Sequence, residues 1–118
     1  MKVYISIPIS GLDETKQRYK AAKVAKHIKE KGDEPVNPFV DVDHGEIWLT
    51  DCQDDSYIAN LEELTYEDYL CTDLRAMLDC DAIYFCKGWE SSCGCNIEHQ
   101  SAVLYNKFNR KKIKMIYE

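Results

Sequence analysis

The sequence lacks any long apolar stretch. No run within its 118 residues approaches the ~20 apolar residues that a membrane-spanning helix needs. Residues 1–7 are too short, and too quickly interrupted, to be a signal peptide, and they favour a β-strand instead. We therefore expect a cytoplasmic protein without a membrane partner, whose six cysteines are reduced thiols rather than a disulfide framework.

Basic residues are also in the minority. The chain has 15 Lys and Arg residues against 21 Asp and Glu residues, which gives a formal net charge of −6. A chain of this charge lacks the electrostatic attraction that dominates binding to nucleic-acid polymers. We expect no nucleic-acid polymer among its partners.

Several cofactor and metal motifs are missing as well. The paired Cys-x2-Cys spacing of structural zinc sites does not occur. The most closely spaced cysteines are Cys80, Cys86, Cys93 and Cys95. One glycine in the first turn, Gly11, is too few for a dinucleotide or flavin site. That turn also lacks the acidic residues of a phosphoacceptor receiver domain. We expect neither a metal nor a cofactor.

Strands and helices alternate along the chain. Strands are predicted over residues 2–7, 34–38, 82–86 and 112–117, and helices over 13–31, 65–80 and 92–108. This alternation predicts one α/β domain over 1–118, with a parallel sheet covered on both faces. The specific expectation is a flavodoxin-like three-layer α/β/α sandwich with four to five strands in the order 2-1-3-4. Such sheets bind ligands beyond the carboxyl ends of their strands.

Residues 39–64 form the least regular part of the chain and are strongly acidic. We expect a long loop with one short helical turn, and loops of this length are usually functional or mobile. Its aspartates do not follow calcium-loop spacing. His44 in this stretch, and His99, have no paired helical partner, so we interpret both as surface residues rather than metal ligands.

The most informative segment is 88–102, where small residues run from a buried strand into a helix. Free backbone amides at a helix N-terminus can hold an anion. Ser91 and Ser92 can cap the helix and can also donate to a phosphate oxygen. Glu98 lies in the second turn and could face the same crevice. From spacing alone this is a generic anion pocket, and the alternative is a capped helix with a solvent-facing Glu98.

Two further features carry candidate side chains. Asp73 shares a helix face with Tyr69 and Met77, so it is either a rim charge in an ion pair or a poised acid/base. Tyr4 and Ser6 alternate onto one face of the first strand. Hydroxyls near that strand end could bind a sugar, or could satisfy loop backbone.

Together these segments resemble the nucleoside 2-deoxyribosyltransferase superfamily, which includes the 2'-deoxynucleoside 5'-phosphate N-hydrolases. The resemblance rests on the first strand with its glycine turn, on Asp73 and Asp81 with the apolar strand that follows, and on segment 92–102. It covers most of the chain outside 39–64 and is nearest to short bacterial and phage members without an assigned function.

The resemblance implies a mechanism and a set of site residues. Glu98 would attack the anomeric carbon and displace the base, which forms a covalent glycosyl-enzyme. Asp73 would assist base departure or orient the nucleophile, and the Tyr4 hydroxyl would steady the glutamate. The candidates for substrate contact are Ser6, Gly11, Trp89, Ser91, Ser92 and Gly94. The resemblance also implies a homo-oligomer, because sites in the superfamily are often completed by a neighbouring subunit.

One position bears on the substrate. In the family, the residue six before the nucleophile is an aspartate that binds a 5'-hydroxyl in transferases, or a serine that binds a 5'-phosphate in hydrolases. Here it is Ser92. We therefore expect cleavage of the N-glycosidic bond of a (deoxy)nucleoside 5'-monophosphate. The alternatives are a non-catalytic nucleotide-binding or sensing module of the same fold, and a nucleoside 2-deoxyribosyltransferase.

Overall fold

The computed structural model describes residues 1–42, 44 and 66–118. Along the chain it contains β1 (Lys2–Ser6), α1 (Glu14–Glu30), β2 (Glu34–Val36), α4 (Tyr66–Leu78), β3 (Ala82–Phe85), the 3-10 turn η2 (Trp89–Ser91), α5 (Cys93–Phe108) and β4 (Lys114–Tyr117). All seven predicted strands and helices are present, with ends that differ by one or two residues. Thr65, the expected cap of α4, and most of the expected loop over 39–64 lie outside the described residues.

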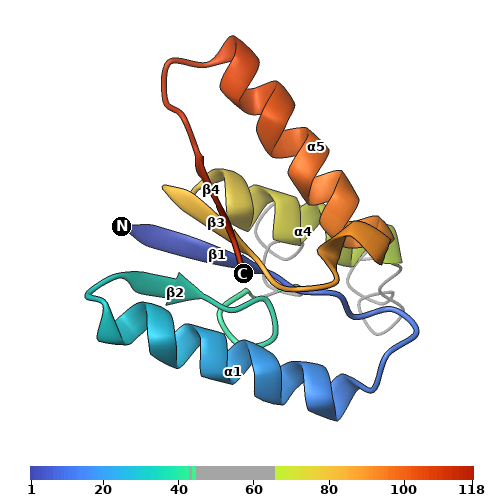
Figure 1. Cartoon of the computed structure of the whole chain (residues 1–118). Coiled ribbons are helices and arrows are strands. Elements are labelled where there is room, and N and C mark those ends of the chain that lie inside the picture. The colour runs from blue at the N-terminus through green and yellow to red at the C-terminus, as the bar shows by residue number, and fades with distance from the viewer. Residues whose placement is uncertain (43, 45–65) are drawn as a thin grey trace, which may run out of the picture.

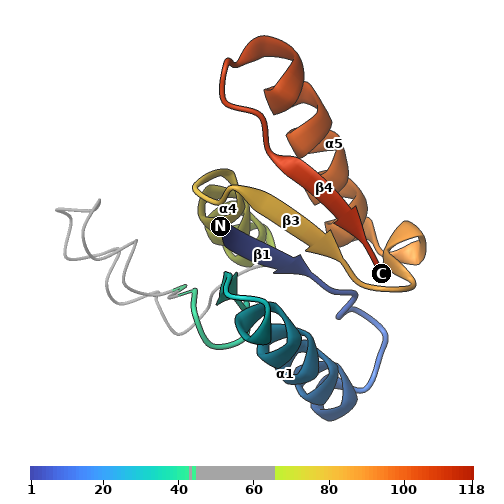
Figure 2. The ribbon, with the colours of Figure 1, turned by 60° about the vertical axis from the view of Figure 1, so that its left-hand side comes forward.

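The four strands form one parallel sheet in the order β2-β1-β3-β4 (Figure 1). Helix α1 covers one face of this sheet, and α4 and α5 cover the other, so the molecule has three layers (Figure 2). The prediction of a parallel α/β/α sandwich with strand order 2-1-3-4 is confirmed, and the arrangement is consistent with a flavodoxin-like fold. Because all strands run in the same direction, their carboxyl ends meet at one edge.

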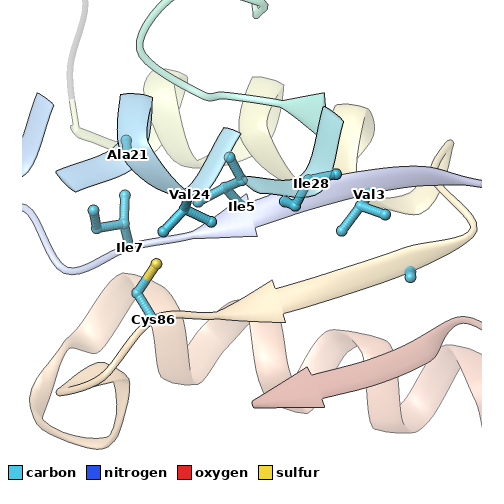
Figure 3. Packing of buried hydrophobic residues seen from close by; sticks show 8 residues of the cluster. Val3, Ile5, Ile7, Ala21, Val24, Ile28 and Cys86 are labelled. Carbon is cyan, nitrogen blue, oxygen red and sulfur yellow. The ribbon is translucent and has the colours of Figure 1, made fainter. Parts of the chain in front are cut away.

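Side chains of β1 alternate between the two layers, as the period of a strand requires. Val3 and Ile5 pack against α1, where Val24 and Ile28 meet them (Figure 3). Burial of each such side chain stabilises the fold by roughly 1.5–3 kcal/mol. The rest of this cluster comprises Ile7, Ala21, Ala82 and Cys86.

The second core cluster aligns the two helices on the opposite face. Tyr4 lies there with Met77 of α4 and Ala102 of α5, all nearly inaccessible to solvent. Residues four apart share a helix face. Burial of Met77 therefore brings Asp73 toward Tyr4 from α4, and burial of Ala102 brings Glu98 toward it from α5.

The connection from β3 to α5 begins with Gly88, whose φ of 92° is the left-handed conformation that favours glycine. Ser92 then caps α5, because its side-chain oxygen accepts a hydrogen bond from the Cys95 amide at 3.3 Å. The expected cap at Ser92 is confirmed. Its effect is to fix the first turn of α5 at the carboxyl edge of the sheet.

Among the described residues, Cys71, Cys80, Cys86, Cys93 and Cys95 are free thiols. The same part of the chain contains no cluster of three or more metal-ligating side chains. None of its helices combines the length and apolarity needed to cross a bilayer.

Candidate active site

A cavity of about 460 Å³ opens at the carboxyl edge of the sheet. Its wall is built from the end of β1 and the loop after it, from α1, from the segment after β2, from α4 and from the first turns of α5. Among the side chains that line it are Tyr4, Arg18, His44, Asp73, Ser92 and Glu98. This is the edge at which parallel α/β sheets bind ligands.

Glu98 faces inward because it belongs to the buried stripe of α5, together with Cys95 and Ala102. The residue is only 6 % exposed. The Ser6 hydroxyl donates a hydrogen bond of 3.0 Å to its Oε1. Its Oε2 is buried, and no donor in the described part of the chain completes a hydrogen bond to it. Glu98 lines the cavity, and an unpaired buried carboxylate oxygen is costly, so Oε2 is a polar atom of this wall that lacks a partner among the described residues. The alternative of a solvent-facing Glu98 is wrong.

Burial is the main reason that the pKa of Glu98 is raised to about 7. The negative charge of Asp73 raises this pKa further, whereas the hydroxyls of Tyr4 and Ser6 lower it by favouring the carboxylate. Tyr4 is itself buried, which raises its pKa well above the usual value, so the phenol keeps its proton near neutral pH. Glu98 therefore holds carboxylate and acid in similar amounts near neutral pH.

Asp73 lies on α4 and pairs with His44. His44 Nε2 is 2.8 Å from Asp73 Oδ1, and each side chain is 19 % exposed. Burial raises the pKa of Asp73, and the contact with His44 lowers it. The His44 ring also contacts Tyr69, with ring centroids 4.8 Å apart. The prediction that His44 is a surface residue is wrong, because a carboxylate 29 positions along the chain holds it in the cavity wall.

Ser92 and Gly94 bring the N-terminus of α5 to the cavity. The Ser92 oxygen accepts from the Cys95 amide, and the Ser92 hydroxyl also contacts the Cys95 side chain, where it lowers the pKa of the thiol. A Cβ atom at Gly94 would lie 3.3 Å from the Tyr66 hydroxyl, so the side chain of Tyr66 reaches from α4 to this turn. A larger residue at position 94 would require a small shift of that hydroxyl.

Arg18 of α1 was not among the predicted site residues. Its guanidinium lies 4.7 Å from the centre of the Phe39 ring and 3.6 Å from a Glu14 carboxylate oxygen. Of the described residues that line the cavity, Arg18 is the one with a permanent positive charge. Six lysines lie between residues 16 and 31 of the same helix region, so nothing in the sequence distinguishes Arg18 from a solvated basic face.

Four expected contact residues do not line the cavity. Trp89 stacks on His99, with ring centroids 4.5 Å apart, because η2 turns it toward an aromatic cluster with Phe85 and Tyr117. Ser91 is exposed, and Gly11 serves the turn after β1 through its φ of 78°. Ser6 acts through its bond to Glu98.

Fold and site together define a parallel α/β protein with a cavity at the carboxyl edge of its sheet, whose wall includes the buried carboxyl group of Glu98. The chain belongs to the family described as a domain of unknown function, DUF4406, whose model matches residues 1–108. No curated protein and no solved structure matches the chain. The matched range includes every residue placed in the cavity wall.

Proposed function

We propose that this protein cleaves the N-glycosidic bond of a (deoxy)nucleoside 5'-monophosphate and releases free base and sugar phosphate. The observation that carries the proposal is the buried carboxyl group of Glu98, a residue of the cavity wall whose Oε2 has no hydrogen-bond partner among the described residues. An ionised Oε2 can bond to the anomeric carbon as the bond from that carbon to the base breaks. Water then hydrolyses the glycosyl ester, and the sugar leaves with its configuration retained.

The electrostatics of Glu98 support this role. Positive charge develops on the sugar ring as the base departs, and a carboxylate next to that ring stabilises the charge most strongly where water is excluded. Burial supplies such an environment. Burial also raises the pKa of Glu98 to about 7, which still leaves a large carboxylate fraction at neutral pH.

Two hydroxyl groups favour the reactive form of Glu98. Ser6 donates to Oε1, which leaves Oε2 as the oxygen that the proposal assigns to the attack on the sugar. The Tyr4 hydroxyl favours the charged carboxylate, and its own raised pKa keeps it protonated. Asp73 is the second carboxyl group of the site. In the proposed reaction it assists departure of the base or orients the groups that do so.

The phosphate would be recognised at the N-terminus of α5 and by Arg18. The Ser92 hydroxyl and the amides of the first α5 turn are donors, and a helix N-terminus favours an anion. The Arg18 guanidinium adds a positive charge and a bidentate donor geometry that suits phosphate oxygens. These groups support a nucleotide over a nucleoside as substrate.

Replacing Ser92 with aspartate is expected to weaken binding of a deoxynucleoside monophosphate by at least ~10-fold, because a carboxylate at this position repels the phosphate. Aspartate is as good a helix cap as serine, so the melting temperature should hardly change. Calorimetric titration with a deoxynucleoside and with its 5'-monophosphate measures the effect. S92N, which also caps but carries no charge, is the matched control. If S92D weakens binding of the nucleoside and of its monophosphate equally, or weakens neither, phosphate recognition at Ser92 would be contradicted.

The proposed activity itself is tested with a panel of ribo- and deoxyribonucleoside monophosphates, followed by chromatography for free base. Release of base from at least one member is the expected result. Nucleotide-dependent thermal shifts without any base release would favour a binding or sensing module instead. Base exchange that needs a second free base would favour a transferase.

A further inference from the structure

We propose that His44 is the group that protonates the departing base, and that Asp73 is the positioning residue that holds it. This inference rests on the proposed function and assigns the acid step within the same site. It rests on the short His44–Asp73 contact and on the fact that both side chains line the same cavity as Glu98.

The His44 ring is held on two sides. Nε2 lies 2.8 Å from Asp73 Oδ1, and the ring packs against Tyr69 at an interplanar angle of 58°. Asp73 engages Nε2, so the proposal assigns the transferred proton to the other ring nitrogen, Nδ1. A carboxylate that contacts one imidazole nitrogen orients the ring.

The same contact argues against Asp73 as the direct donor. When Asp73 accepts a hydrogen bond from His44 it has no proton of its own to transfer, and in the proposed reaction the proton comes from the His44 ring instead. His44 also lies on a different element from Glu98, beyond β2 rather than on α5, and both residues line the cavity. A nucleophile and an acid come from different residues, because they act on different atoms of the glycosidic bond.

The proton balance of the reaction closes with water as the only co-reactant. Oε2 of Glu98 bonds to the anomeric carbon while the electron pair of the C–N bond moves to the base. The base takes the Nδ1 proton from the His44 imidazolium and leaves neutral. Neutral His44 then takes a proton from water as its oxygen attacks the anomeric carbon, and Glu98 departs as a carboxylate. Both side chains return to their starting states.

The test compares two leaving groups on the same sugar phosphate. One substrate is a deoxynucleoside monophosphate that the wild-type enzyme cleaves, and the other carries a 4-nitrophenolate, which departs without protonation. H44A should lower kcat on the nucleotide by ~100-fold or more and on the nitrophenyl substrate by less than ~5-fold. H44Q can still contact Asp73 but cannot transfer a proton, so it should show the same losses as H44A. D73N should show the same selectivity with a smaller loss. H27A, at an exposed histidine of α1, is the matched control.

Each outcome separates the two proposals. If E98Q inactivates the enzyme on both substrates while H44A and H44Q retain nitrophenyl cleavage, both proposals are supported. If H44A and H44Q lose both activities equally, His44 has only a structural role and the acid assignment is overturned. If E98Q retains either activity, the nucleophile assignment fails regardless of His44. Melting temperatures of all variants show that the enzymes compared are folded.

Discussion

Replacing Glu98 with glutamine is expected to lower base release by roughly 1,000-fold or more, since an amide oxygen cannot form the glycosyl ester that the mechanism requires. Glutamine has nearly the same shape and can keep the contact with Ser6, so the cavity should be preserved. Initial rates of free base formation, followed by chromatography at saturating substrate, measure the loss. Because binding of the sugar phosphate does not need the carboxylate, the apparent affinity for nucleotide should change much less.

The matched control is Glu90→Gln. Glu90 is an exposed acidic residue on η2, close in sequence to Glu98 and absent from the cavity wall. The Glu90→Gln substitution should leave the rate of base release within about twofold of wild type. A Glu98→Gln enzyme with near-normal turnover would rule out Glu98 as the nucleophile, whatever else lines the cavity.

Replacing Glu98 with glutamine is also expected to stabilise the fold above neutral pH. The pKa of Glu98 is about 7 in the folded protein against 4.5 for an ordinary glutamate. Below 4.5 both folded and unfolded chains carry the proton, so the carboxyl group adds no penalty. Between 4.5 and 7 the unfolded chain ionises first, and stability falls as the pH rises. Above 7 the full penalty of about 3 kcal/mol applies to the wild type, and glutamine removes it.

Denaturant unfolding of wild type and Glu98→Gln between pH 4 and pH 9 measures this difference. The two curves should meet near pH 4.5 and separate to about 3 kcal/mol above pH 7, which corresponds to about 10 °C in melting temperature. Glu90→Gln serves as the reference for removal of one surface charge. A difference that is constant with pH, or that grows toward acid, would contradict the burial of Glu98 as the cause of its raised pKa.

The sequence was sufficient to predict the fold, for reasons that individual elements make clear. The uninterrupted apolar run at 82–86 predicted a central strand, and that strand pairs with both β1 and β4. Asp13 and Ser92 predicted helix starts, and each accepts a hydrogen bond from an amide of the first turn. Such local signals determine element type and order, and right-handed crossovers between parallel strands then leave few arrangements.

The site could be predicted only in part. Alternation along β1 places Tyr4 and Ser6 on one face, so these two residues follow from local geometry. Spacing alone left Glu98 either in an anion pocket or facing solvent, and the structure places it in the buried stripe of α5. His44 and Arg18 do not follow from local geometry, since each reaches the cavity only through tertiary packing against Asp73 or Phe39. Trp89 shows the opposite failure. It lies near the helix start in sequence, yet η2 turns its ring to the aromatic cluster instead.

Mass spectrometry of the protein during turnover tests the central claim most directly. A nucleotide analogue with an electronegative fluorine at C2' slows both formation and hydrolysis of the glycosyl ester, and a good leaving group restores the first step alone. After acid quenching, the intact chain should gain the mass of one fluorinated sugar phosphate, and the peptide that carries Glu98 should hold it. E98Q should gain none. Base release without any adduct, or an adduct on another residue, would contradict Glu98 as the nucleophile.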